Sequence, residues 1–190
     1  MVERLGTPTV SILMTCYNRA KYIGVAIESV IASSFKDWEL IIVDDRSTDN
    51  TYTIATEYAS KDNRIAVYRN EKNLGDYHNR NKAASYARGK YLKYLDSDDL
   101  IYPYSLEIMI DHIKKYPQVG LVFCDHLNQD NSGPFPILYN TYQAYYQHFL
   151  KAYLFYAGPG GTLIRTDVFR ELGGFSGKRY LGDTEMWMKI

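Results

Sequence analysis

The stretch KYLKYLDSDD, Lys90–Asp99, decides the fold of this 190-residue chain. Its first half, rich in Tyr and Leu, predicts a β-strand that ends in Asp96, Asp98 and Asp99. Along an extended backbone side chains alternate between faces, so we expect Asp96 and Asp98 to point the same way and Ser97 the opposite way. Two such carboxylates repel each other unless a cation lies between them, and Mg²⁺ or Mn²⁺ prefers oxygen ligands. An acidic loop that caps the following helix is the alternative interpretation.

Apolar runs alternate along the chain with stretches of helical periodicity. Further strands are predicted at Thr9–Thr15, Trp38–Val43, Arg64–Arg69, Val119–Cys124 and Thr162–Arg165. Helices are predicted from Tyr22 to about Ser33, from Ser47–Asn50 through Tyr58, from Asn73–Gly75 to Arg88 with Gly89 as the residue after its end, from Pro103, over Thr141–Tyr156 and Asp167–Leu172, and from Asp183. The segment Asp125–Asn140 is rich in Asn, Gly and Pro and predicts a loop. This order predicts an α/β fold with a mostly parallel central sheet flanked by helices.

Polar clusters follow three of the predicted strands, at Thr15–Arg19, Asp44–Ser47 and Asp96–Asp99. In open parallel sheets, ligands bind at the carboxyl ends of the strands. A purely structural role does not explain so many carboxylates at one edge of the sheet, which we call the rim. We therefore expect a ligand site there.

Composition narrows the function classes. Lys+Arg and Asp+Glu both number 22, and this zero net charge argues against a nucleic-acid binder that works by bulk charge. The two cysteines are too few for a disulfide framework or a zinc site and favour a cytoplasmic setting. The sequence shows no signal-peptide pattern, no apolar run long enough to span a membrane, no Walker A loop and no Gly-x-Ser-x-Gly elbow.

Four segments, in order, resemble family 2 glycosyltransferases of the GT-A fold: VSILMTCYNRAKYI, WELIIVDDRSTDNT, NLGDYHNRNKAASYARGKYLKYLDSDD and YLGDTEMW. The resemblance implies a Rossmann-like sheet and an enzyme that moves a sugar from a nucleotide-diphosphate donor, with a UDP-sugar favoured, to an acceptor hydroxyl. It further implies inversion at the sugar and a Mg²⁺ or Mn²⁺ cofactor. A role in surface polysaccharide or glycolipid biosynthesis follows by family analogy alone.

The resemblance also implies site residues. It assigns nucleotide binding to Thr15, Tyr17, Asp44, Asp45, Arg80 and Asp96. Within this set, Tyr17 would stack beside the base, Asp45 would hydrogen-bond it, and Arg80 would contact the donor. Asp98 is the implied metal ligand, and Asp96 would reach the ribose or a metal-bound water.

Asp183 matches the acid of the family's Glu-Asp motif and is the implied general base. Gly182 stands where the family often has Glu, although a Gly-Asp version also occurs among relatives. A metal-bound diphosphate leaves without protonation, so one base suffices, whereas a glycoside hydrolase needs two facing carboxylates.

We expect residues 1–190 to form a single GT-A catalytic domain whose natural chain continues, because the sequence ends inside the helix predicted from Asp183. The implied partners are the nucleotide-sugar donor and a glycan or lipid-linked acceptor. The aromatic stretch Tyr139–Tyr156 suits core packing or a homodimer contact first, and an acceptor groove or the inner face of the membrane second. The turn Gly158–Gly161 either presents backbone N–H groups to the acceptor or is a plain turn.

Two other functions stay open. One is a nucleotide-sugar-binding domain of a larger synthase without turnover of its own, although the intact acidic residues argue against degeneracy. The other is a nucleotidyltransferase, which also places carboxylates and a metal beside a nucleotide. Such an enzyme is expected to carry a Gly-rich basic phosphate loop near its N-terminus, and Thr15–Arg19 is not one.

Overall fold

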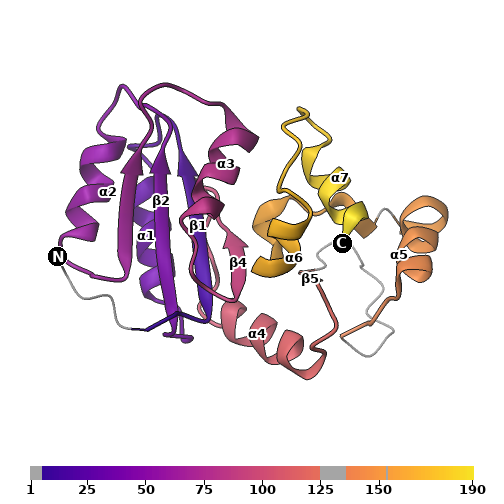
Figure 1. Cartoon of the computed structure of the whole chain (residues 1–190). Coiled ribbons are helices and arrows are strands. Elements are labelled where there is room, and N and C mark those ends of the chain that lie inside the picture. The colour runs from indigo at the N-terminus through magenta and orange to yellow at the C-terminus, as the bar shows by residue number, and fades with distance from the viewer. Residues whose placement is uncertain (1–5, 125–135, 153) are drawn as a thin grey trace.

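The computed structural model describes residues 6–124, 136–152 and 154–190. Within them a six-stranded sheet has the order β3-β2-β1-β4-β6-β5 (Figure 1). The strands are β1 (Val10–Cys16), β2 (Trp38–Asp44), β3 (Ile65–Arg69), β4 (Tyr91–Tyr94), β5 (Leu121–Phe123) and β6 (Thr162–Arg165). Strands β1 to β4 pair in parallel, whereas β6 runs antiparallel to both β4 and β5. The predicted mostly parallel α/β fold is confirmed.

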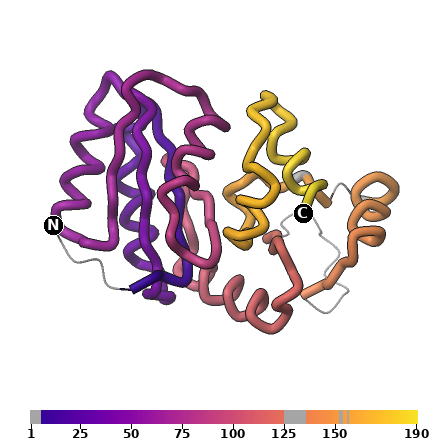
Figure 2. Tube along the Cα trace, in the orientation of Figure 1, coloured from indigo at the N-terminus to yellow at the C-terminus, as the bar shows by residue number. Residues whose placement is uncertain are grey.

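Helices cover both faces of the sheet (Figures 1 and 2). They are α1 (Ile23–Ile31), α2 (Thr51–Ala59), α3 (Asp76–Ser85), α4 (Ser105–Lys115), α5 (Thr141–Gln147), α6 (Thr166–Glu171) and α7 (Gly182–Lys189). Residues of α1, α2 and α4 share one apolar core with the sheet, and residues of α3, α6 and α7 share the other. Within β1, Ile12 and Met14 enter the first core and Leu13 the second. This is why the strand is apolar at nearly every position instead of alternating.

Several element ends differ from the prediction for local reasons. Helix α3 stops at Ser85 instead of Arg88, and α4 begins at Ser105 with Pro103 ahead of it. Neither Ser47 nor Asn50 caps α2 through its side chain; Asp49 accepts a hydrogen bond from the Thr51 N–H instead. The predicted loop Asp125–Asn140 lies largely outside the described residues.

The aromatic segment after Asn140 is not one continuous α-helix. Asn140 and Gln143 form a capping box that starts α5, but after Gln147 the chain continues as a π-helix, His148–Ala152, and a short 3₁₀ turn, Leu154–Tyr156. No residue of α5 is fully buried and only its Ala144 packs against the second core, but Phe155 farther along the predicted stretch lies in that core, so core packing holds for part of the stretch. A homodimer contact stays a prediction. No helix in the described part of the chain is long and apolar enough to cross a membrane.

Gly89 does not serve as a helix-ending residue but lies against β1, between α3 and β4. Its N–H donates to the Ser11 Oγ at 2.8 Å, and a Cβ on Gly89 would lie only 2.6 Å from the Ser11 backbone nitrogen. Because backbone atoms and the buried Ser11 side chain occupy this space, position 89 has no room for a side chain.

We therefore predict that Gly89→Ala destabilises the protein by about 1–3 kcal/mol through overpacking. For a chain of this size the melting temperature would fall by roughly 2–4 °C per kcal/mol, measured by thermal unfolding. Gly158→Ala is the matched control, since nothing lies within 4 Å of its Cβ position and its φ is −65°. Equal melting temperatures for Gly89→Ala and the native chain would contradict this account of the packing.

Candidate functional site

The three predicted polar clusters do meet at one edge of the sheet. Strands β2, β1 and β4 are neighbours, with Cys16 beside Asp44 and Leu13 beside Tyr94. At this edge Thr15 is partly buried, and Tyr17 is 45% exposed just beyond the strand. The polar edge predicted from the carboxyl ends of these strands therefore exists, with Tyr17 at its surface.

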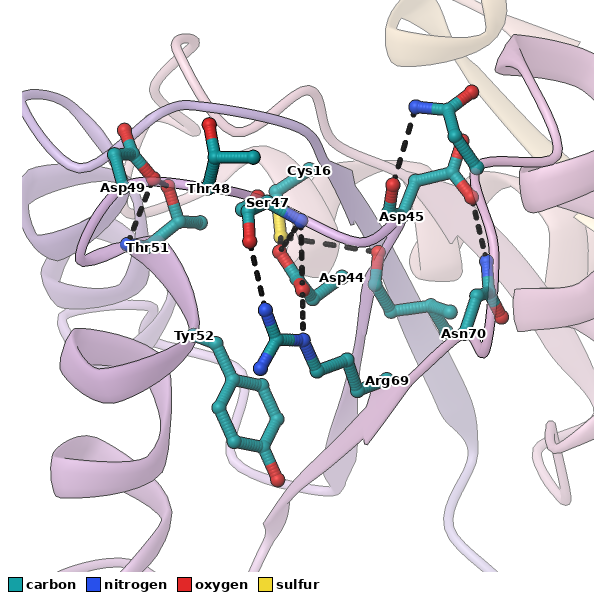
Figure 3. A network of polar contacts seen from close by, with 12 residues as sticks. Cys16, Asp44, Asp45, Ser47, Thr48, Asp49, Thr51, Tyr52, Arg69 and Asn70 are labelled. Atoms are coloured by element: carbon teal, nitrogen blue, oxygen red, sulfur yellow. Dashed lines mark hydrogen bonds and ion pairs between the residues drawn. The ribbon is translucent and has the colours of Figure 1, made fainter.

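Asp44 is fully buried at this edge of the sheet and orders the loop that contains Ser47 (Figure 3). Its carboxylate is 3.1 Å from the Arg69 Nε and accepts the Ser47 N–H at 3.1 Å. Arg69 also donates from Nη2 to the Ser47 carbonyl at 2.7 Å, and its guanidinium lies 5.0 Å from the centre of the Tyr52 ring. Figure 3 shows these groups converging from β2, β3 and α2. Any contribution of Asp44 to nucleotide binding thus passes through the loop that it holds.

Asp45 joins the end of β2 to the segment that enters α3. Its Oδ1 accepts hydrogen bonds from the Asn70 Nδ2 at 2.7 Å and the Leu74 N–H at 2.8 Å, and its Oδ2 accepts the Gly75 N–H at 2.9 Å. Only 3% of the residue is exposed. A carboxylate has about four acceptor positions, so three donors leave capacity for one more, such as the N–H of a base.

Arg80 is buried on α3 between two carboxylates. Its Nε lies 2.7 Å from the Asp76 Oδ1, and its Nη2 lies 2.7 Å from the Asp96 Oδ1. Burial opposes the charged form, but Asp96 and Asp76 outweigh it and raise the pKa of Arg80. The Nη1 atom is buried and has no hydrogen-bond partner among the described residues. A buried cation with an unused donor at the rim suits an anionic ligand.

The acidic stretch after β4 is a turn rather than a continuing strand. The strand ends at Tyr94, and the Asp99 N–H donates to the Asp96 carbonyl at 3.0 Å. The expected alternation of Asp96, Ser97 and Asp98 is therefore wrong, because it requires an extended backbone. Asp98 instead pairs with Arg19 from the loop after β1, with 3.1 Å between the Arg19 Nε and the Asp98 Oδ2. The two carboxylates are neutralised by different guanidinium groups.

The donor set of this turn fits a hard divalent cation. In the described part of the chain no three His, Cys, Asp or Glu side chains are grouped closely enough to hold a metal. Mg²⁺ is usually bound through one or two carboxylates together with substrate phosphates, so a single carboxylate such as Asp98 is sufficient. The Asp98 side chain is 44% exposed, and the side chain of its partner Arg19 is 42% exposed. Asp98 is therefore accessible to a metal that arrives with a diphosphate.

Lys93 is a buried cation behind this turn that the sequence reasoning missed. Its ammonium group donates a hydrogen bond to the Gly160 carbonyl, and the residue is 4% exposed. Burial lowers the pKa of Lys93 to about 8, although the nearby Cys124, Asp96 and Asp99 act in the opposite direction. The available signal was a lysine inside an otherwise apolar strand. Lys93 ties the turn Gly158–Gly161 to β4.

Asp183 lies in the first turn of α7 and is partly buried. Its Oδ1 accepts the Thr184 N–H at 2.8 Å. Next to it, Gly182 lies against the ring of Tyr77 on α3. Since α3 also carries Arg80, which reaches Asp96, one helix connects the predicted base with the acidic turn. The sequence reasoning missed Arg69 and Tyr77, because nothing in their local pattern marks them, and it placed Arg19 in the cluster Thr15–Arg19 without predicting its pairing with Asp98.

Comparisons with known proteins agree with this architecture. An uncharacterised glycosyltransferase of Methanocaldococcus jannaschii is 39% identical over 125 residues, which are 65% of this chain and 43% of that protein. The glucosyltransferase WfgD of Escherichia coli, named for UDP-Glc and α-D-GlcNAc-diphosphoundecaprenol, is 39% identical over 106 residues, 56% of this chain and 41% of that protein. The chain thus spans less than half the length of these relatives.

Two solved structures share the fold. Residues 1–349 of S. aureus TarS, in complex with UDP-GlcNAc, superpose with a TM-score of 0.75 at 24% identity, over 95% of this chain and 52% of that fragment. The mannosyltransferase PcManGT from Pyrobaculum calidifontis, in complex with GDP-Man and Mn²⁺, gives a TM-score of 0.71 at 20% identity, over 96% and 51% of the two chains. At these identities the likeness establishes the fold, and it confirms the predicted GT-A class. Residues 11–173 match the sequence profile of glycosyl transferase family 2, and the chain belongs to that family.

Proposed function

We propose that this chain carries the donor and catalytic site of an inverting glycosyltransferase that takes its sugar from a UDP-sugar. The observation that carries the proposal is Arg80, a buried cation paired with Asp96 at the rim and left with one unpartnered Nη1. A diphosphate is the kind of anion that such a group binds through charge-assisted hydrogen bonds. The bound UDP-GlcNAc of TarS supports the choice of donor.

In this proposal the nucleotide lies across the ends of β1 and β2. Tyr17 is exposed at the rim and offers its ring to the base, while Thr15 lies beside it. Asp45 supplies the remaining acceptor position of its carboxylate to the base. Asp44 contributes indirectly, since it holds the Ser47 loop through Arg69. Asp96, fixed by Arg80, faces the ribose or a metal-bound water.

Asp98 is the proposed ligand of Mg²⁺ or Mn²⁺, and the Mn²⁺ bound with GDP-Man in PcManGT supports this cofactor. A divalent cation there would stabilise the negative charge that develops on the departing diphosphate. For Asp98 to take part, Arg19 must leave its carboxylate, and the released guanidinium is then available to the phosphates. The ion pair between Asp96 and Arg80 stays intact when Arg19 leaves Asp98.

Asp183 is the proposed general base. It accepts the proton of the acceptor hydroxyl, whose oxygen attacks the anomeric carbon from the side opposite the diphosphate, so the configuration inverts. Because the diphosphate needs no proton to leave, no second carboxylate acid is required. The acceptor is proposed to be a glycan or a lipid-linked glycan, as the lipid-linked substrate in the name of WfgD suggests, and the pathway to be polysaccharide or glycolipid biosynthesis at the cytoplasmic membrane face.

Asp183→Asn is predicted to lower kcat by roughly 10²–10⁴-fold, the usual contribution of a general base. The dissociation constant of the UDP-sugar is predicted to stay unchanged, because the residue acts on the acceptor. Steady-state rates and calorimetric titration measure the two quantities. Asp111→Asn, on the exposed side of α4, is the control. Full turnover in Asp183→Asn would rule out this base.

Arg80→Lys keeps the charge but loses the planar fork that serves two carboxylates and a ligand together. We predict that the dissociation constant of the UDP-sugar rises by about 10-fold or more, in line with losing a charge-assisted hydrogen bond. Arg64→Lys is a matched control. Arg64 also forms a two-point ion pair, with Asp62, but it lies just before the start of β3, at the end of the strand opposite to the site. Equal affinities in native protein and Arg80→Lys would refute the donor site.

A thermal-shift screen of UDP-, GDP- and dTDP-sugars with and without Mn²⁺ tests donor and metal together. Ligands that bind the folded state raise its stability by mass action, by about 2.7 kcal/mol at 100 times the dissociation constant. We predict the largest shift for a UDP-sugar with Mn²⁺, and in Asp98→Asn only the metal-dependent part should vanish. A metal-dependent shift without any turnover would favour the alternative, a binding domain of a larger synthase. No shift with any donor would contradict both.

A further inference from the structure

Gly182 and Tyr77 are fitted to each other across two helices. A Cβ added to Gly182 would lie 2.9 Å from both Cε2 and Cζ of the Tyr77 ring, closer than a Cβ and an aromatic carbon can approach. Only glycine at position 182 therefore lets this ring lie where it does. Because Cζ carries the phenolic oxygen, the contact brings the hydroxyl end of the ring to the start of α7, where Asp183 follows.

The surroundings of the Tyr77 hydroxyl include both the carboxylate and the backbone N–H of Asp183. Burial raises the pKa of Tyr77, and the negative charge of Asp183 acts in the same direction, whereas a hydrogen bond from the Asp183 backbone N–H acts in the opposite direction. A phenol can accept a backbone N–H through its oxygen and at the same time donate its O–H to a carboxylate oxygen, so both contacts with Asp183 are compatible. One oxygen of Asp183 already accepts the Thr184 N–H at 2.8 Å. A second donor at the side chain would leave the carboxylate with a single orientation.

The helix that carries Tyr77 is itself fixed on both sides. Asn81, one turn along α3, donates to the Phe175 carbonyl at 2.8 Å and accepts the Phe175 N–H at 2.9 Å. The Tyr77 ring packs on Phe175, with 5.3 Å between ring centres. On its other side α3 holds Asp96 through Arg80. Tyr77 is thus presented from a rigid element, as precise placement of a reacting group requires.

We propose that Tyr77 is a positioning residue for Asp183, with its ring seated on Gly182 and its hydroxyl donating a hydrogen bond to the Asp183 carboxylate. The inference rests on the proposed function, since it gives Tyr77 a role only if Asp183 is the base. Tyr77 aims the carboxylate at the acceptor hydroxyl and takes no proton itself. The same contact fixes the distance between the base on α7 and the donor side held by α3.

Tyr77→Phe tests the hydroxyl without disturbing the ring. We predict a fall in kcat of about tenfold with the KM for the UDP-sugar unchanged, because donor binding does not involve Asp183. Tyr68→Phe is the control, since the Tyr68 ring lies on β3, where it stacks on Tyr86. An unchanged donor-induced thermal shift verifies that Tyr77→Phe is folded. A kcat equal to that of the native protein would overturn the role of Tyr77.

A double-mutant cycle separates positioning from a general loss of structure. If Tyr77 acts through Asp183, adding Tyr77→Phe to Asp183→Ala lowers the residual rate no further. A multiplied loss in the double variant would overturn the inference. The result is also distinguishable from a failure of the proposed function. Full turnover in Asp183→Ala would rule out Asp183 as the base. A loss of turnover in Asp183→Ala together with native turnover in Tyr77→Phe would rule out only the role of Tyr77.

Discussion

The site depends on one ion pair at the edge of the sheet, between the buried Arg80 on α3 and the partly exposed Asp96 after β4. Removing a guanidinium from water carries a large desolvation cost, which Arg80 offsets with two carboxylates at 2.7 Å. The pair joins a helix on one face of the sheet to the turn at the end of its central strand. Its remaining buried donor, Nη1, has no hydrogen-bond partner in the part of the chain that the structure describes. The cost of that unsatisfied group is a reason for the site to favour an anion.

The carboxylates at this edge of the sheet differ in their exposure and in the groups that contact them. Asp44 is fully buried with Arg69 and orders a loop, whereas Asp98 is 44% exposed and pairs with an exposed arginine. Asp45 lies between these extremes, held by backbone N–H groups. Acidic residues that look alike in the sequence thus differ in exposure according to which cation or donor the fold brings to each.

Helix α3 connects the acidic turn after β4 with the start of α7. It carries Tyr77 toward α7, Arg80 toward the turn after β4 and Asn81 toward Phe175. One helix thus contacts groups that are distant in the chain, such as Phe175, 94 residues from Asn81. The same geometry explains Gly182: the ring of Tyr77 occupies the space that a side chain at that position would need.

The sequence by itself determined the α/β class, the polar clusters at the carboxyl ends of three strands, and the family. Continuous apolar strands, helical periodicity and four ordered motifs are local patterns, and they can be recognised in the sequence alone. Only the tertiary structure decided that Asp96–Asp99 is a turn, that Asp44 is buried, and that Arg19, Lys93 and Tyr77 belong to the site. Those facts depend on contacts such as Arg19 with Asp98, 79 residues apart. Side-chain burial and long-range pairing arise from packing, and no pattern of neighbouring residues encodes them.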